Sequence, residues 1–184
     1  MNLKNLNAAE WFAFSRFLTF PVVLLFIFLN QRAIASWLFL LFFTTDIIDG
    51  VVARVFHQEG KRRAKLDSWG DILFLVTGMV GLVWFEPDFF VNNLTWVLLP
   101  VLMYLLEMVF TLAKFKKLSN YHTYLAKFTA FVQVVFIVHA LFFGVSNILF
   151  YLAVFFSTVD PLEDIYITYQ LKTWKANING IWCL

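Results

Sequence analysis

The chain has 184 residues, of which 61% are hydrophobic, 20% aromatic and only 14% charged, with a formal net charge of +2. Soluble domains carry about 25% charged residues, so this composition excludes an ordinary soluble protein and indicates a polytopic membrane protein. The small net charge does not indicate a nucleic-acid partner, because the basic residues fall in short stretches beside apolar segments.

Six apolar segments, each near the length of about 20 residues that a bilayer needs, predict six transmembrane helices in an all-α fold. They lie at about residues 17–29, 33–56, 66–85, 94–113, 125–143 and 148–169. The aromatic-rich segment from Trp11 predicts a short N-terminal interfacial helix that leads into the first span. The last span is interrupted by acidic residues and a proline, at Asp160, Pro161, Glu163 and Asp164. No internal repeat or second-domain boundary is visible, so we expect a single membrane domain over residues 1–184.

The connecting segments distribute positive charge unevenly. With the N-terminus in the cytoplasm, thirteen of the 14 Lys and Arg residues lie on the cytoplasmic side, and Arg32 alone lies outside. Cytoplasmic loops carry an excess of Lys and Arg, so this arrangement predicts the orientation. The basic loop expected at residues 57–65 then faces the cytoplasm, and the acidic turn from Glu86 to Asp88 faces the opposite side. We expect an integral, multi-pass protein with both termini in the cytoplasm.

Four carboxylates occur inside the second and third apolar segments, at Asp46, Asp49, Asp67 and Asp71. A charge at membrane depth is costly, so intramembrane acids favour a functional role. On helices, spacings of three and four residues place each pair on one face. Converging carboxylates repel one another, and a hard divalent cation such as Mg²⁺, Mn²⁺ or Ca²⁺ removes that repulsion. The alternatives are structural pairing with basic residues or an ion pathway in a transporter.

The depth of the two pairs in the membrane is an independent argument that the two halves of the site meet. At 1.5 Å per residue, Asp46 lies about 20 Å from the outer end of its helix, and Asp71 about 21 Å from the outer end of the next one. The two halves therefore meet at one level, below the cytoplasmic headgroups of a core about 30 Å thick. A lipid pyrophosphate reaches this level from the side, and a soluble alcohol reaches it from the cytoplasm.

The four acids belong to a motif that reads Asp-Ile-Ile-Asp-Gly-Val-Val-Ala-Arg at residues 46–54 and Asp-x-x-x-Asp at residues 67–71. This motif resembles a family signature. It is similar to that of the CDP-alcohol phosphotransferases, integral membrane enzymes of phospholipid synthesis with six spans. The resemblance implies that a CDP-linked lipid, usually CDP-diacylglycerol, gives its phosphatidyl group to an alcohol and releases CMP. The chain departs from the signature at Arg63, where the family usually has a glycine. This departure favours the alternative of an inactive relative retained as a membrane interaction protein.

The resemblance also implies roles for single residues. Asp46, Asp49 and Asp67 are metal ligands, with two Mg²⁺ or Mn²⁺ ions as the expected cofactors. Asp71 lies beside the second ion and acts as the general base that deprotonates the acceptor hydroxyl. The residues expected to lie against the CDP moiety are Gly50, Ala53 and Arg54. A homodimer is expected from the same resemblance.

Three further residues carry expectations. Lys127 and the residues that follow it resemble the family's Lys-x-x-Thr-x-x-x-Gln pattern loosely, so we expect Lys127 to contribute to substrate binding. Glu107 lies within the fourth apolar segment and needs a partner that the sequence does not name. Arg54 could pair with a carboxylate, but its planar fork of donors also suits a phosphate, which is the partner that we favour. The sequence does not select the acceptor among glycerol phosphate, inositol or its phosphate, serine, choline and other alcohols.

Overall fold

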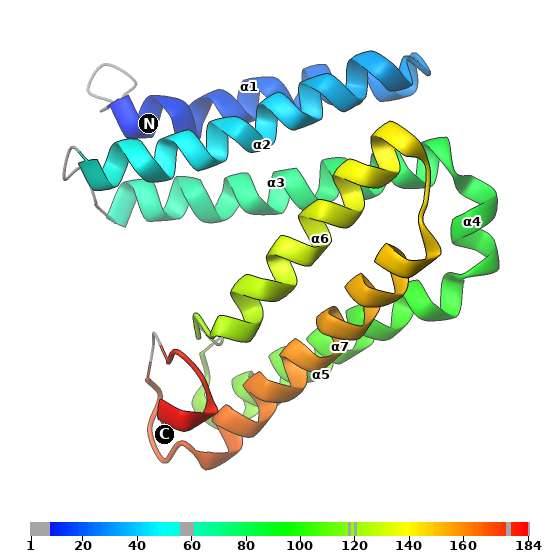
Figure 1. The fold of residues 1–184 in the computed structure, drawn as a ribbon. Helices are drawn as coiled ribbons and strands as arrows, with labels where there is room; N and C mark the ends of the chain where they lie inside the picture. The colour runs from blue at the N-terminus through cyan, green and yellow to red at the C-terminus, as the bar shows by residue number, and fades with distance from the viewer. Residues whose placement is uncertain (1–7, 56–60, 118, 120, 176–177, 184) are drawn as a thin grey trace. The chain divides into compact units, whose positions relative to one another are not determined.

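The computed structural model describes residues 8–55, 61–117, 119, 121–175 and 178–183. These residues form seven α-helices, one short 3-10 helix and no strand (Figure 1). The predicted all-α fold is therefore confirmed. At residues 8–16, 46–47, 49–55, 61–69 and 71–72 only the backbone is described.

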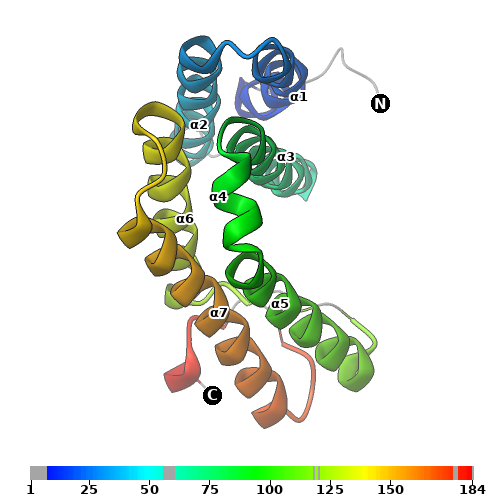
Figure 2. The same ribbon diagram turned by 90° about the vertical axis from the view of Figure 1, so that its right-hand side faces the viewer.

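The chain divides into two compact units, and the first contains the predicted motif. It consists of α1 (Ala8–Phe28), α2 (Arg32–Val55) and α3 (Lys61–Phe85), together with residues 140–144. The helix α1 packs against both α2 and α3, which also pack against each other (Figures 1 and 2). The core of this unit is made of apolar side chains from all three helices, including Val23, Ile27, Phe39, Phe42 and Leu82.

The second unit contains α4 (Pro87–Asn92), α5 (Leu94–Phe115), most of α6 (Tyr124–Phe143), α7 (Asn147–Gln170) and the 3-10 helix η2 (Ile181–Cys183). The helices α5 and α7 run side by side in both views (Figures 1 and 2). After α7 the chain folds back, and the buried Ile178 packs with Tyr121 and Ile167. The backbone N–H of Tyr124 donates to the carbonyl of Asn179 at 3.0 Å, which ties the C-terminal segment to the start of α6.

Most predicted segments agree with the helices, and three differ. The expected interfacial helix and first span form one continuous helix, α1. The expected basic loop at residues 57–65 is wrong in its second half, because α3 begins at Lys61. Lys, Arg and Ala favour helix, which explains this longer start. The helix α7 continues through Pro161, although the acids and proline there suggested an interruption. Residues 56–60 lie outside the described part of the chain.

Two helices, α5 and α6, are long and apolar enough to cross a membrane by length and composition. Shorter apolar stretches lie in α1, α2 and α3, at Phe17–Phe28, Arg32–Thr45 and Leu73–Phe85. Large apolar side chains of α5, including Leu102, Leu106 and Val109, are exposed, which fits a helix that faces lipid. The expected number of six spans stays a prediction.

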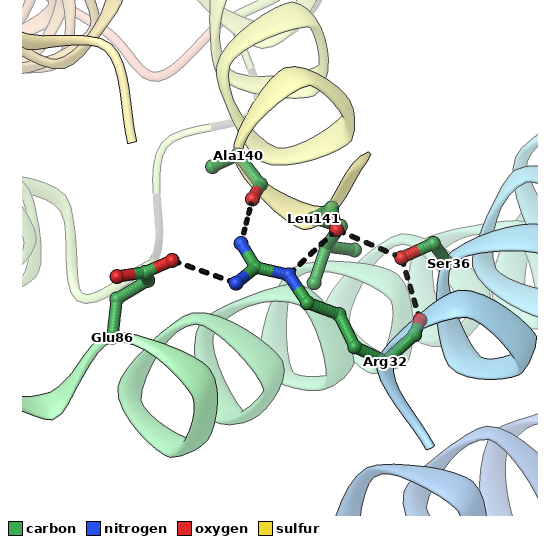
Figure 3. A network of polar contacts seen from close by, with 5 residues as sticks. All are labelled: Arg32, Ser36, Glu86, Ala140 and Leu141. Atoms are coloured by element: carbon green, nitrogen blue, oxygen red, sulfur yellow. Dashed lines mark hydrogen bonds and ion pairs between the residues drawn. The ribbon is translucent and has the colours of Figure 1, made fainter. Parts of the chain in front are cut away.

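Arg32, at the start of α2, joins several parts of the first unit. Figure 3 shows its guanidinium paired with Glu86 at 2.8 Å and donating to the carbonyls of Ala140 and Leu141 at 2.7 and 3.0 Å. The hydroxyl of Ser36 donates to the Leu141 carbonyl at 2.9 Å. These carbonyls belong to the last turn of α6, where helix carbonyls need outside donors and a cation complements the helix dipole. Arg32 therefore holds the start of α2, the end of α3 and the end of α6 together.

Candidate active site

The four predicted metal ligands lie on two neighbouring helices of the first unit. Asp46 and Asp49 are on α2, and Asp67 and Asp71 are on α3. Their backbones are helical, as predicted from the sequence. Their side chains lie outside the described part of the chain, so the ligand geometry stays a prediction.

An aromatic cluster next to these residues fixes the alignment of α2 against α3. The ring of Phe74 on α3 stacks on Phe39 of α2, with centroids 4.4 Å apart and an angle of 26° between the planes. Phe74 also contacts Phe42 and Phe43, each with centroids 5.6 Å away. Phe39, Phe42 and Phe74 are buried. Aromatic pairs of this kind contribute about 0.5–1.5 kcal/mol beyond the area that they bury, so the cluster specifies one register.

This register places the two halves of the motif at the same level. Asp46 follows Phe42 by four residues, and Asp71 precedes Phe74 by three. The helices α2 and α3 run in opposite directions (Figure 1). Both aspartates therefore lie on the same side of the aromatic cluster, toward the end of α2 and the start of α3. At 1.5 Å per residue, the backbone of Asp46 is displaced from that of Phe42 by about 6 Å, and the backbone of Asp71 from that of Phe74 by about 4.5 Å. The packing of described residues thus supports the common depth expected from the sequence.

The other predicted residues of the motif also lie on these helices. Gly50, Ala53 and Arg54 are on α2, where only the backbone is described. Arg63 is in the first turn of α3 and not in a loop, so the expected loop position is wrong.

Lys127 lies on α6, in the second unit. It is exposed, and its ammonium lies 5.1 Å from the centroid of the Tyr124 ring. The two other residues of the loose pattern bind α7: Thr129 donates to the Phe156 carbonyl at 3.4 Å, and Gln133 donates to Ser157 at 2.8 Å. These two residues therefore serve packing between α6 and α7, while the role of Lys127 in substrate binding stays a prediction.

The donor chemistry of the motif fits a divalent metal ion. Carboxylate oxygens on neighbouring helices are ligands that Mg²⁺ and Mn²⁺ prefer. Among the side chains that the structure describes, no three His, Cys, Asp or Glu residues are grouped so that they could hold a metal ion. The four motif aspartates are not among those side chains.

The structure identifies the partner that Glu107 needs. Glu107 is only 2% exposed, and its Oε1 accepts a hydrogen bond from the Thr111 hydroxyl at 2.9 Å. The Thr111 oxygen lies 3.1 Å from the hydroxyl of Thr168, which lies 3.0 Å from that of Tyr121. The partner is therefore a chain of hydroxyl groups that links α5, α7 and the segment before α6.

Sequence reasoning missed a group of acids near Glu107. Asp160, Glu163 and Asp164 were interpreted only as an interruption of the last span, but they lie on the continuous helix α7. Each has one buried carboxyl oxygen without a hydrogen-bond partner among the described residues. Their spacing of three and four residues could have shown that they share one helix face.

Comparison with known proteins gave one match. The sequence model of the CDP-alcohol phosphatidyltransferase family matches residues 6–159, which include the four motif aspartates and Lys127. No curated protein and no solved structure matched the chain.

Proposed function

Because the chain belongs to the CDP-alcohol phosphatidyltransferase family, we propose that it transfers the phosphatidyl group of CDP-diacylglycerol to a small alcohol. The observation that carries this proposal is the alignment of α2 and α3 by the aromatic cluster around Phe74. This alignment supports a common level for the backbones of Asp46 and Asp71, as a shared site for the pyrophosphate requires.

The proposed reaction follows from the chemistry of the four acids. Asp46, Asp49, Asp67 and Asp71 would together hold two Mg²⁺ or Mn²⁺ ions. Bound ions supply positive charge that offsets the charge developing on the pyrophosphate oxygens. Asp71 takes the proton of the acceptor hydroxyl as general base. The hydroxyl oxygen forms a bond to the phosphorus that carries diacylglycerol, the bond from this phosphorus to the CMP oxygen breaks, and CMP leaves.

The remaining motif residues bind the nucleotide. Gly50 has no side chain, so it leaves room for the CDP moiety close to the backbone of α2. Ala53, one turn further on, is also small. Arg54 presents a planar fork of donors to a phosphate. A contribution of Lys127 to substrate binding is proposed from the loose resemblance of its pattern alone.

The proposed enzyme is a multi-pass membrane protein with six spans and a site that opens to the cytoplasm. The support is the distribution of Lys and Arg, of which only Arg32 falls outside. The pairing of Arg32 with Glu86 agrees with this topology, because both residues were expected on the same side. The homodimer is proposed from the family alone.

The direct test is an acceptor panel with the full chain in lipid nanodiscs. CDP-diacylglycerol, Mg²⁺ or Mn²⁺ and one alcohol at a time are supplied, with glycerol phosphate, inositol, inositol phosphate, serine and choline as the first set. We expect one acceptor to give CMP and a new phospholipid in equal amounts. The matched control is Asp88→Asn, which changes an exposed carboxylate of α4 and should keep full activity. Absence of a new phospholipid with every acceptor would contradict the proposal.

Arg63 favours a second candidate, an inactive relative that acts as a membrane interaction protein. An arginine in the first turn of α3 replaces the glycine expected from the resemblance. Activity of Arg63→Gly together with an inactive wild-type chain would support this candidate. A metal-ion transporter would instead show divalent ion flux into liposomes without CMP release.

A further inference from the structure

The second unit carries all of its lysines at one end. Residues 88–139 and 145–184 contain six lysines and no arginine, and all six lysine side chains are exposed. Three lie at the end of α5 or directly after it, one in the first turn of α6, and two after the end of α7. We call these residues the lysine surface: Lys114, Lys116, Lys117, Lys127, Lys172 and Lys175. The proposed transferase reaction uses only one of them, Lys127.

Contacts between described side chains bring the parts of the lysine surface together. The ammonium of Lys114 donates to the carbonyls of Thr168 and Tyr169, in the last turn of α7, at 2.9 and 2.8 Å. The ammonium of Lys117 lies 4.7 Å from the ring centroid of Trp174, in the segment after α7. The end of α5 is therefore held against the end of α7 and the segment that follows it (Figure 1).

Aromatic rings also accompany the lysine of α6. The ammonium of Lys127 lies 5.1 Å from the centroid of the Tyr124 ring. That ring stacks on Trp182, with centroids 6.2 Å apart and 21° between the planes, and the side chain of Trp182 is 72% exposed. Tryptophan and tyrosine are enriched where membrane proteins meet the headgroup layer, and a ring face attracts an ammonium. The lysine surface therefore combines held cations with exposed aromatic rings.

The acids of the second unit do not offset this charge at the surface. All five acids of residues 88–139 and 145–184 are among the described side chains, and Asp88 alone of these is exposed. Asp88 lies on α4, before the start of α5, and the 22 residues of α5 span about 33 Å. The other four acids are buried or half-buried. Even if all four were ionised, the lysines would outnumber them, and only the lysines are exposed.

The position of the lysine surface along the helices identifies what lies beside it. The helices α5 and α6 are long and apolar enough to cross a membrane, and the lysine surface begins where α5 ends and α6 begins. A bilayer core is about 30 Å thick, which matches the length of α5. A bilayer crossed by these helices therefore places the lysine surface in one headgroup layer and Asp88 near the other.

We propose that the lysine surface binds anionic phospholipids of the surrounding bilayer through their phosphate groups. An ammonium has three N–H donors, and Lys114 uses two of them on carbonyls of α7, so each lysine retains donors for phosphate oxygens. Lysines beside an anionic leaflet attract its headgroups. A second copy of the same surface fits less well, because it would bring like charges together. This inference does not depend on the proposed transferase reaction, because its test measures lipid binding.

The test begins with two lipids that differ in headgroup charge. The full chain in a neutral detergent is titrated with a short-chain phosphatidylglycerol, and separately with phosphatidylcholine of the same acyl chains. Retained lipid is counted by native mass spectrometry. A chelator is present throughout, so that lipid held through metal ions at the motif does not contribute. We expect saturable retention of phosphatidylglycerol, at least tenfold weaker retention of phosphatidylcholine, and competition by phosphatidylserine, which is also anionic.

Variants of exposed residues separate charge from aromatic contact. A lysine near an anionic surface is worth about fivefold in affinity, which corresponds to about 1 kcal/mol. The double variant Lys117→Gln with Lys172→Gln should therefore bind phosphatidylglycerol about 25-fold more weakly. Trp182→Leu should also weaken retention. Its matched control is Trp96→Leu, because Trp96 lies at the other end of α5, is 47% exposed and contacts the Tyr151 ring with centroids 5.6 Å apart. Trp96→Leu should bind as the wild type does.

Three further measurements distinguish the other occupants. Inorganic phosphate should not displace the lipid, because it lacks the acyl chains that hold the headgroup beside the protein. Raised salt should weaken phosphatidylglycerol retention in the wild type more than in the double lysine variant, since exposed charges are screened. The oligomeric state should be the same in both chains. Equal retention of the two lipids, unchanged affinity in the double variant, displacement by inorganic phosphate, or a dimer that the double variant loses would overturn the proposal.

Discussion

The guanidinium of Arg32 lies 2.8 Å from the carboxylate of Glu86, and this ion pair closes one end of the hairpin formed by α2 and α3. Asp46 follows Arg32 by 14 residues, and Asp71 precedes Glu86 by 15. These separations correspond to about 21 and about 22 Å along the two helices. The ion pair and the aromatic cluster therefore fix the register of the hairpin at two levels, and the motif lies beyond both.

Arg32 should matter more for stability than its partner does. Arg32→Gln removes the ion pair and two hydrogen bonds to α6, whereas Glu86→Gln removes the ion pair alone. Both side chains are about one-third exposed, at 35% and 29%, so the ion pair itself contributes only about 0–1 kcal/mol. Thermal unfolding in detergent should show a clearly larger decrease for Arg32→Gln. Equal decreases for the two variants would mean that the contacts with α6 contribute little.

Removal of the Phe74 ring should loosen the hairpin at the motif. Phe74→Ala deletes a buried ring that contacts Phe39, Phe42 and Phe43, and such truncations cost about 3–5 kcal/mol. We expect a lower unfolding temperature, and lower CMP release even at temperatures where the variant is folded. The matched control is Leu75→Ala, whose side chain is 39% exposed on the same helix. If both variants kept wild-type turnover, the aromatic cluster would not set the geometry of the site.

The sequence predicted most of the helices because their apolar segments are long and bounded by polar turns. The turn at Asn30 illustrates this, since its φ of 57° ends α1 before α2 begins at Arg32. The start of α3 was misplaced because Lys61 to Lys65 were judged by charge and not by helix propensity. The short helix α4 was not anticipated, because the segment from Glu86 to Asp88 was interpreted only as a turn, although Pro87 is a favourable first helical residue.

The site itself was predictable only in part. The motif and its two helices follow from residue spacing, whereas the contacts that align them do not. Phe74 is one of 24 phenylalanines, and nothing in its local sequence separates it from those that face outward. The group of acids near Glu107 was missed for a related reason: Glu107 and Asp160 are 53 residues apart, and only the packing of α5 on α7 brings their helices together.

The proposed topology predicts which residues an impermeant reagent can reach. In a background of Cys183→Ser, a cysteine at Asp88 should be labelled in intact cells, and one at Lys172 only after permeabilisation. Both native residues are exposed, so a difference in labelling reports the membrane side and not burial. The reverse pattern would place the motif on the side opposite to the cytoplasm.

Asp71 should affect turnover more than nucleotide binding. If it accepts the proton of the alcohol, Asp71→Asn should reduce turnover by about 10²–10⁴-fold, the usual contribution of a general base. CDP affinity should fall less than it does in Asp49→Asn, because Asp49 is proposed to hold the pyrophosphate through the bound ions. The comparison requires CDP binding and CMP release to be measured on the same preparations. Equal losses of affinity in the two variants would assign Asp71 to metal ligation alone.

The most direct test of the account is CMP release from CDP-diacylglycerol by the wild-type chain, Asp46→Asn and Asp88→Asn in the same nanodiscs. The wild type and Asp88→Asn should release CMP when the acceptor and Mg²⁺ or Mn²⁺ are present, and a chelator should stop the release. Asp46→Asn should release none while it keeps the unfolding temperature of the wild type within a few degrees. Full CMP release by Asp46→Asn, or by the wild type in the presence of chelator, would contradict the assignment of the site to the α2–α3 hairpin.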